Sequence, residues 1–135
     1  MNNDLQTATL SYKPLSRRKQ SFLNLAQRAA ESSECVHKHG AIIVRSGSVL
    51  SIGVNKWRNI HTPTQDIFKN GLRSDLSVHA EMDALSRVAM PAGATIYVAR
   101  VRKNGKPALS KPCKDCAQKL KEAGIAKIIY TVDGE

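Results

Sequence analysis

Three fragments of the sequence carry side chains that could perform chemistry at one centre. His79 and Glu81 stand two residues apart, Cys113 and Cys116 form a C-x-x-C pair, and Asn55 follows an apolar run. Each fragment alone is a weak signal, because a single histidine is usually an ordinary polar residue and a C-x-x-C pair also serves redox chemistry or structural zinc. Together, and in this order, they indicate a shared metal centre.

These residue types favour zinc. Cys113 and Cys116 are i and i+3 on a predicted helix, so both sulfurs can reach one ion, and the start of a helix lowers the pKa of a thiol toward the thiolate that binds zinc. With His79 as a third ligand, the charge of Zn²⁺ is balanced and a fourth tetrahedral position stays open, as in catalytic zinc sites. Water bound there has a pKa near about 7, and Glu81 is a candidate to accept its proton and pass it to a substrate.

The length of 135 residues predicts one domain, which we place over residues 16–135 after a loosely ordered lead-in over residues 1–15. The composition is that of a globular protein, and no apolar run reaches the roughly 20 residues that a membrane-spanning helix needs. The polar stretch at residues 1–13 lacks the apolar core of a secretory signal, and three cysteines, two of them in C-x-x-C, fit a reducing compartment. We therefore expect a cytoplasmic protein with no membrane partner.

The charge of the chain is strongly positive. The sequence has 21 Lys and Arg against 11 Asp and Glu, a formal net charge of +10. Such a field attracts phosphorylated ligands, from a mononucleotide to a nucleic acid. The alternative is that the excess charge serves only solubility.

Hydrophobic spacing predicts three helices and four strands that position these residues. Ser16 can cap the first helix, Pro91 follows the second and Gly124 ends the third, while a polar turn at residues 45–48 joins two strands into a hairpin. The predicted helices cover residues 16–32, 78–90 and 112–124, and the predicted strands cover residues 41–44, 49–54, 95–101 and 127–132.

This order of elements predicts an α/β protein with a mixed central sheet. The strands are apolar almost throughout, so they need helices on both faces. Residues 56–77 follow no clear period, and a loop of this length in a compact domain is more often functional than idle. We expect this loop to border the site.

Two motifs resemble the H-x-E and P-C-x-x-C signature of the cytidine deaminase superfamily, namely H-A-E at residues 79–81 and P-C-K-D-C at residues 112–116. The resemblance extends over roughly residues 20–133. It implies a cytidine deaminase-like three-layer α/β/α sandwich with a mixed central sheet. It also implies a zinc cofactor bound by His79, Cys113 and Cys116, with Glu81 as the proton shuttle.

Three further stretches resemble the N-terminal half of deoxycytidylate deaminases, many of which are encoded by viruses. They are S-E-C at residues 33–35, G-A-I-I-V at 40–44 and G-V-N at 53–55. By this resemblance Asn55 contacts the sugar of the substrate, and the main chain near Ala80 holds the pyrimidine edge. A longer zinc-bearing insertion, frequent in that subfamily, is absent from this sequence.

The resemblance implies a hydrolase that acts on the C–N bonds of cyclic amidines. Zinc-bound hydroxide attacks C4 of cytosine, Glu81 moves protons as base and acid, and ammonia leaves to give uracil. The best single substrate is dCMP, converted to dUMP, with a cytosine nucleoside or another nucleotide as the wider class. Enzymes of this superfamily are commonly oligomers, so we expect a homo-oligomer.

Two other functions stay open. A polynucleotide deaminase, acting on cytosine in single-stranded DNA or RNA or on adenosine in tRNA, fits the charge of +10. Against it, Lys111 stands where tRNA adenosine deaminases usually have glutamate, and residues 108–111 lack aromatic side chains. A zinc-stabilised nucleotide-binding module without catalysis is the other alternative, although Glu81 would then have no use.

Several residues near these motifs allow more than one interpretation. Cys35 is interpreted as a buried small apolar residue. His37 and His39 are interpreted as surface or packing residues, with a place beside the substrate phosphate or a second zinc site with Cys35 as alternatives. Trp57 and Phe68 are assigned to the core rather than to base stacking. For three basic residues of the predicted loop, phosphate binding and an ordinary solvated position both stay open, namely Arg58, Lys69 and Arg73.

Overall fold

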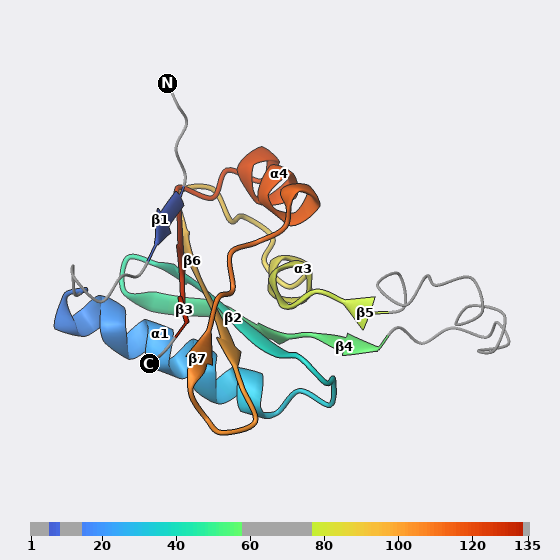
Figure 1. The fold of residues 1–135 in the computed structure, drawn as a ribbon. Helices are drawn as coiled ribbons and strands as arrows, with labels where there is room; N and C mark the ends of the chain where they lie inside the picture. The colour runs from blue at the N-terminus through green and yellow to red at the C-terminus, as the bar shows by residue number, and fades with distance from the viewer. Residues whose placement is uncertain (1–5, 9–14, 58–76, 134–135) are drawn as a thin grey trace, which may run out of the picture.

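The structure, a computed structural model, describes residues 6–8, 15–57 and 77–133, which contain three helices and two sheets (Figure 1). The helices are α1 (Arg17–Glu31), α3 (Ala80–Leu85) and α4 (Lys114–Glu122). The strands are β1 (Gln6–Ala8), β2 (Lys38–Arg45), β3 (Ser48–Val54), β4 (Lys56–Trp57), β5 (Ser77–Val78), β6 (Thr95–Val101), β7 (Pro107–Ala108) and β8 (Lys127–Tyr130).

The main sheet is mixed, as predicted. Its six strands follow the order β1-β8-β6-β2-β3, and β7 pairs with the end of β6. β2 pairs antiparallel with both β3 and β6, whereas β6 and β1 each pair parallel with β8. A smaller sheet of β4 and β5 lies next to the start of α3. The predicted hairpin of β2 and β3 is therefore confirmed.

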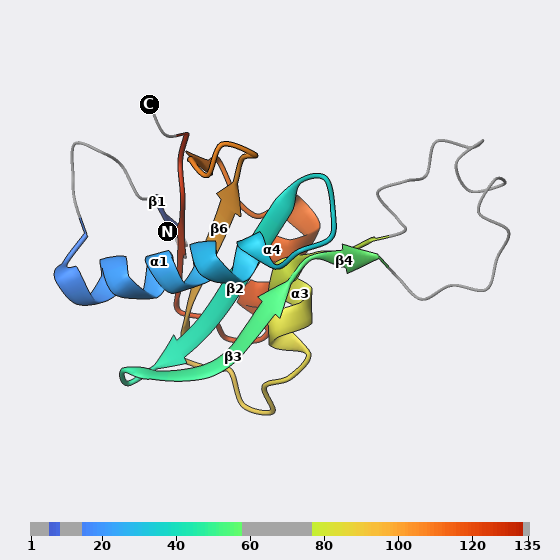
Figure 2. The same ribbon diagram turned by 90° about the horizontal axis from the view of Figure 1, so that it is seen from below.

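Helices cover both faces of the main sheet, so the predicted three-layer α/β/α sandwich is confirmed. In Figure 2, α1 crosses one face while α3 and α4 lie on the other. Apolar side chains of β2 and β6 alternate between the two layers, because successive strand residues point to opposite faces. Ile42 and Tyr97 pack toward α1, whereas Ile43 and Val98 pack toward α3.

The first helix begins where the sequence predicts. The hydroxyl of Ser16 accepts a hydrogen bond from the main-chain N–H of Lys19 (3.3 Å), which satisfies one of the free donors at the start of α1. Gly124, with a φ of 90°, follows α4 as predicted, because this left-handed conformation favours glycine. None of the helices in the described ranges has both the length and the apolar character needed to cross a bilayer.

The second and third predicted helices are shorter than expected. The helix predicted over residues 78–90 corresponds to α3, which covers only Ala80–Leu85. At its start Val78 belongs to β5, and at its end Ser86 already forms the C-terminal cap. Pro91 disfavours helical geometry in the residue before it. The helix predicted to begin near Pro112 begins at Lys114, with Cys113 in extended conformation as its cap.

Four short strands were not predicted from the sequence. β4 and β5 occupy both ends of the loop predicted over residues 56–77, β7 lies between the third predicted strand and the third predicted helix, and β1 lies within the predicted lead-in. A strand of two or three residues has too little alternation to be recognised in a sequence. The rest of that loop, residues 58–76, lies outside the described residues.

Gly53 sets how closely α3 approaches the sheet. A methyl group at this position would overlap the main chain of Ala80 and Ala84 in α3. We expect Gly53→Ala to displace α3 and to lower the free energy of unfolding by about 1–3 kcal/mol, the usual cost of overpacking. Denaturant unfolding measures this change. The exposed neighbour Ile52, changed to Ala, is the control and should cost about 1 kcal/mol or less. Equal losses in both variants would contradict the close-packing argument.

Candidate active site

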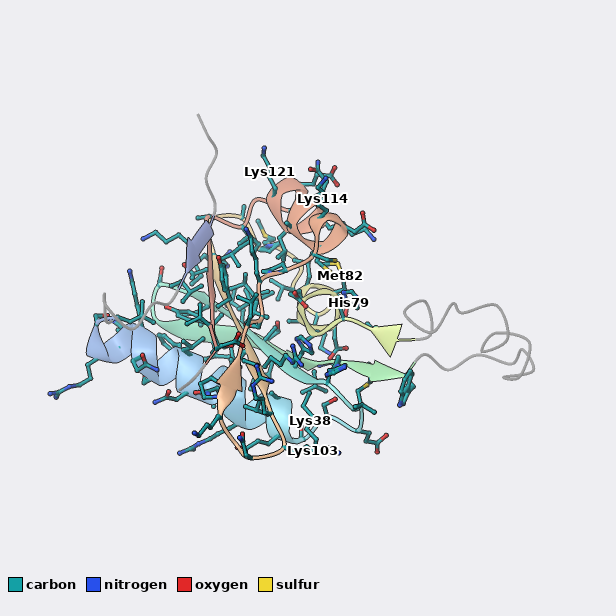
Figure 3. The ribbon with its side chains drawn as sticks, in the orientation of Figure 1. Lys38, His79, Met82, Lys103, Lys114 and Lys121 are labelled. Atoms are coloured by element: carbon teal, nitrogen blue, oxygen red, sulfur yellow. The ribbon has the colours of Figure 1, made fainter. Side chains whose placement is uncertain are left out.

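Three potential metal ligands meet between α3 and α4. The ligand atoms of His79, Cys113 and Cys116 all lie within 4.8 Å of one another. Nδ1 of His79 is 3.2 Å from Sγ of Cys116 and 3.8 Å from Sγ of Cys113. Figure 3 labels His79 at the start of α3 and Lys114 at the start of α4, on the same side of the sheet.

The ends of two helices bring these residues together. His79 is the N-terminal cap residue of α3, and Cys113 is the cap residue of α4. The main-chain N–H of Cys116 points toward Sγ of Cys113 at 3.5 Å, which directs both sulfurs to one side of the helix start. The expectation that both cysteines lie inside one helix is therefore corrected, because Cys113 precedes the helix.

The donor set fits zinc. With Zn–S bonds of about 2.3 Å and Zn–N bonds of about 2.05 Å, tetrahedral geometry separates nitrogen and sulfur ligands by about 3.6 Å. The observed separations of 3.2 and 3.8 Å lie on either side of this value. Within the described residues the group has three members and no fourth protein ligand. Three ligands are the number that leaves a position open for chemistry.

Glu81 is a buried acid next to this group. Its side chain is 5% exposed, and burial raises its pKa, opposed by a hydrogen bond from its own main chain and by the charge of His79. Burial also raises the pKa of the Cys116 thiol, and the neighbouring Glu81 adds to this effect. Because metals bind the thiolate, metal binding at this site must displace the Cys116 proton.

The group opens into a cavity of about 520 Å³. This volume lies within the range of about 300–1,000 Å³ that is typical of small-molecule sites. His79, Ala80, Glu81 and Cys113 line the cavity, so two of the three predicted ligands and the predicted acid share it with the predicted substrate contact Asn55. The other lining residues are Cys35, Val36, His37, His39, Trp57, Ser110 and Lys111.

Asn55 holds neighbouring residues of the cavity lining in place. Its side-chain oxygen accepts the main-chain N–H of His39 at 2.9 Å, and its amide nitrogen donates to the carbonyl of His37 at 2.6 Å. The carbonyl of Asn55 accepts the hydroxyl of Ser33 at 2.9 Å. This 9% exposed residue therefore fixes the start of β2 against the end of β3 while facing the cavity.

Four residues whose interpretation was open line the cavity, namely Cys35, His37, His39 and Trp57. Cys35 is buried, as interpreted, but it lines the cavity together with His37 and His39. No metal-binding group forms from these three among the residues that the structure describes. Trp57 is 44% exposed and lines the cavity, so its assignment to the core is wrong. Its two-residue strand β4 projects from the end of β3 instead of lying under a helix. Phe68, Arg58, Lys69 and Arg73 lie outside the described residues.

Sequence reasoning missed Ser110 as a cavity residue. Ser110 is buried, donates to the carbonyl of Val98 at 2.8 Å and accepts the main-chain N–H of Thr131 at 3.0 Å. These bonds tie the segment that leads to Cys113 onto β6 and β8. Its partners are 12 and 21 residues away, so no local pattern could have identified it.

His39 predicts a pH dependence of stability. Burial lowers its pKa from 6.5 to about 4, and the charges of Arg100, His79 and His37 add to this. Between these pH values His39 is therefore protonated in the unfolded chain and neutral in the folded chain. The stabilising effect is complete above pH 6.5 and is lost as the pH falls toward 4, in total about 3 kcal/mol at 1.4 kcal/mol per pH unit.

Thermal unfolding between pH 4 and 7.5 tests this expectation. His39→Gln should flatten the acid limb of the stability profile, whereas His37→Gln, a substitution at an exposed position, should leave it steep. Identical profiles for wild type and His39→Gln would show that His39 does not contribute to it.

The α/β/α sandwich, with a His/Cys/Cys group and a buried glutamate at one cavity, is the arrangement of a zinc-type nucleobase deaminase. Comparison with known families agrees. Residues 16–132 match the model of the cytidine and deoxycytidylate deaminase zinc-binding region, and the chain belongs to this family. It is accordingly a hydrolase that acts on C–N bonds.

Solved structures show the same fold. The dCMP deaminase of the cyanophage S-TIM5 in apo form is 25% identical, with a TM-score of 0.65 over 87% of this chain and 86% of that one. Its complex with dCMP and dUMP is 24% identical, with a TM-score of 0.64 over 87% and 85%. A cytidine deaminase from Mycobacterium tuberculosis is 22% identical, with a TM-score of 0.53 over 83% of both chains. A search of curated protein sequences found no match.

Proposed function

We propose that this protein catalyses the hydrolytic deamination of a cytosine mononucleotide, with dCMP converted to dUMP and ammonia. The observation that carries the proposal is the His79, Cys113 and Cys116 group beside a cavity that His79, Cys113 and the buried Glu81 line. The phage dCMP deaminase with a similar fold binds dCMP and dUMP. The net charge of +10 suits a ligand that carries phosphate.

His79, Cys113 and Cys116 would hold zinc, and a bound zinc ion supplies a Lewis acid that brings the pKa of water toward about 7. The two sulfurs and the imidazole come from the starts of two helices that contact each other, so the fold brings the ligands together. Asn55 lines the same cavity as His79 and Cys113. The substrate would therefore lie between the metal group and Asn55.

Glu81 would move the protons. It accepts a proton from the attacking water and donates it to N3 of the ring, and it then takes the remaining proton from the new C4 hydroxyl and delivers it to the amino group, which leaves as ammonia while C4 becomes a carbonyl carbon. The C4–O bond forms and the C4–N bond breaks, so one water is consumed for each ammonia released. Burial raises the pKa of Glu81 toward the range in which one carboxyl can both accept and donate at neutral pH.

Binding of the substrate would use Asn55 and Ala80. Asn55 keeps one amide hydrogen beyond its bond to His37, which could reach a sugar hydroxyl. Ala80 is fully buried and its small side chain leaves room for a ring next to the main chain. Lys111 on the cavity wall, and Arg100 at 3.1 Å from His37, add positive charge that suits a phosphate.

A substrate panel tests the proposal. Cytosine, cytidine, deoxycytidine, CMP, dCMP, dCTP, guanine and adenosine, each assayed for ammonia release, should show the highest kcat/KM with dCMP. Equal or higher activity with the free base or the nucleoside would contradict a nucleotide substrate. Failure with every compound by protein that holds zinc would contradict deamination of any free base, nucleoside or nucleotide in the panel.

A second candidate is deamination of a polynucleotide. The charge of +10 favours it, because binding to a phosphate backbone uses several cations at once. Single-stranded DNA and tRNA therefore belong in the same panel. A steep loss of activity on these polymers between 50 and 200 mM salt, by about 10³ or more, would favour the polymer, whereas a mononucleotide site depends weakly on salt.

A further inference from the structure

Asp83 is a buried carboxylate in α3 that the proposed chemistry does not use. Its side chain is 5% exposed. It accepts the main-chain N–H of Val54 at 3.1 Å and forms ion pairs with Lys56 Nζ at 2.9 Å and Arg87 Nη2 at 3.1 Å. A carboxylate is costly to bury, and its burial is tolerated where charged and polar partners surround it as they do here.

Two of these partners stand on either side of Asn55. Val54 is the last residue of β3 and Lys56 is the first residue of β4, so both ends of the link between these strands are attached to Asp83. Asn55 lies between them and turns its side chain toward β2. Asp83 therefore fixes the main chain that determines where the amide of Asn55 points.

Asn55 transmits this restraint to the cavity wall. Its side chain bonds the N–H of His39 and the carbonyl of His37, and its own main-chain N–H donates to the carbonyl of His39 at 3.2 Å. His37 and His39 line the same cavity as the metal ligands His79 and Cys113. If Val54 and Lys56 lose their bonds to Asp83, Asn55 becomes less restrained, and so do the two histidines that it bonds. This effect needs no direct contact between Asp83 and the histidines.

We propose that Asp83 is a positioning residue for substrate binding, which holds Asn55 through Val54 and Lys56. This inference rests on the proposed function, in which Asn55 contacts the sugar. The proposed role is separate from any effect of Asp83 on the metal ligand His79. The main-chain N–H of Asp83 does donate to the carbonyl of His79 at 2.9 Å, as part of α3. A substitution of the side chain leaves that main-chain bond in place.

Asp83→Asn tests the proposal because it keeps the shape of the side chain and removes both ion pairs. The expected result is a rise in KM for dCMP of about tenfold, the effect of one lost hydrogen bond to substrate, while kcat changes by less than about twofold and zinc content is unchanged. In an Asn55→Ala background, Asp83→Asn should raise KM by less than about twofold, because the two residues act in one chain of contacts.

The matched control is Asp133→Asn. Asp133 also combines a backbone bond, from the N–H of Leu109 at 3.0 Å, with an arginine partner, Arg102 at 2.9 Å, but it is exposed, and neither of these partners bonds Val54, Asn55 or Lys56 among the described residues. Its substitution should leave KM unchanged. An equal rise in KM for Asp83→Asn with and without Asn55, or a loss of zinc or kcat at constant KM, would overturn the proposal.

Amide hydrogen exchange separates this proposal from the proposed function. Asp83→Asn should speed the exchange of the His39 amide, which bonds Asn55 and not Asp83, while the amide of Val98 in the core stays protected. Unchanged exchange at His39 would overturn the positioning role even in an active enzyme. An inactive wild-type protein would contradict the proposed function alone, and the exchange result would still decide the role of Asp83.

Discussion

Replacement of Glu81 by glutamine is expected to reduce kcat for ammonia release by about 10²–10⁴-fold, the usual contribution of a general acid–base group. Glutamine keeps the shape of the side chain but can neither accept nor deliver the protons. Zinc content should stay at that of the wild type, because Glu81 is not a member of the ligand group. Steady-state kinetics and metal analysis on the same preparation measure both quantities.

The stability of Glu81→Gln provides an independent check. Because burial raises the pKa of Glu81 above its ordinary value, the folded state disfavours the ionised form. Ionisation of Glu81 therefore costs stability above that ordinary pKa, and the variant should melt no lower than wild type at pH 7. Glu34→Gln, at an exposed position near the cavity, is the control and should retain full activity. An active Glu81→Gln variant would contradict the assigned proton transfer.

Replacement of Cys116 by alanine is expected to remove zinc, abolish activity and destabilise the fold. Cys116 is buried at the centre of the ligand group, and two ligands bind the ion far more weakly than three. A ligand that binds only the folded state stabilises it by about 3–4 kcal/mol when its free concentration is 100–1,000 times its Kd. The variant should lose a stabilisation of this order.

Thermal unfolding with and without a chelator measures this loss. The chelator should lower the melting temperature of wild type and leave that of Cys116→Ala unchanged. Cys35→Ala is the matched control, since Cys35 is also buried and lines the cavity but does not belong to the ligand group. It should retain zinc and the response to the chelator. A chelator effect of equal size in Cys116→Ala would contradict the ligand assignment.

Local patterns in the sequence were enough to predict the layers of the fold. The α1 helix has a capping serine and a regular apolar face, and β2, β3 and β6 are long apolar runs, so each is recognisable from its own residues. The six-residue α3 was overestimated because the apolar spacing continues beyond Ser86, where the helix has already ended. Packing against β3 at Gly53, rather than helical propensity, holds this short helix.

The metal group was predictable for a different reason, since its residues fall into two compact motifs. The residues that hold the rest of the cavity lining were not. Asp83 meets Val54 across 29 residues, and Ser110 meets Thr131 across 21. Such contacts arise from the sheet order, which places β3 next to α3 and β8 next to β6, and no local spacing encodes them. The position of Trp57 also depends on such contacts between distant elements. Its aromatic side chain favoured an assignment to the core, but β4 leaves it exposed.

Titration of metal-free protein with zinc tests the central claim most directly, with dCMP conversion followed at each addition. Deaminase activity should be absent without zinc, rise in proportion to added zinc and reach its maximum at one ion per chain, as expected for one group made by His79, Cys113 and Cys116. Activity in the metal-free protein, or no dUMP and ammonia at one zinc per chain, would contradict it.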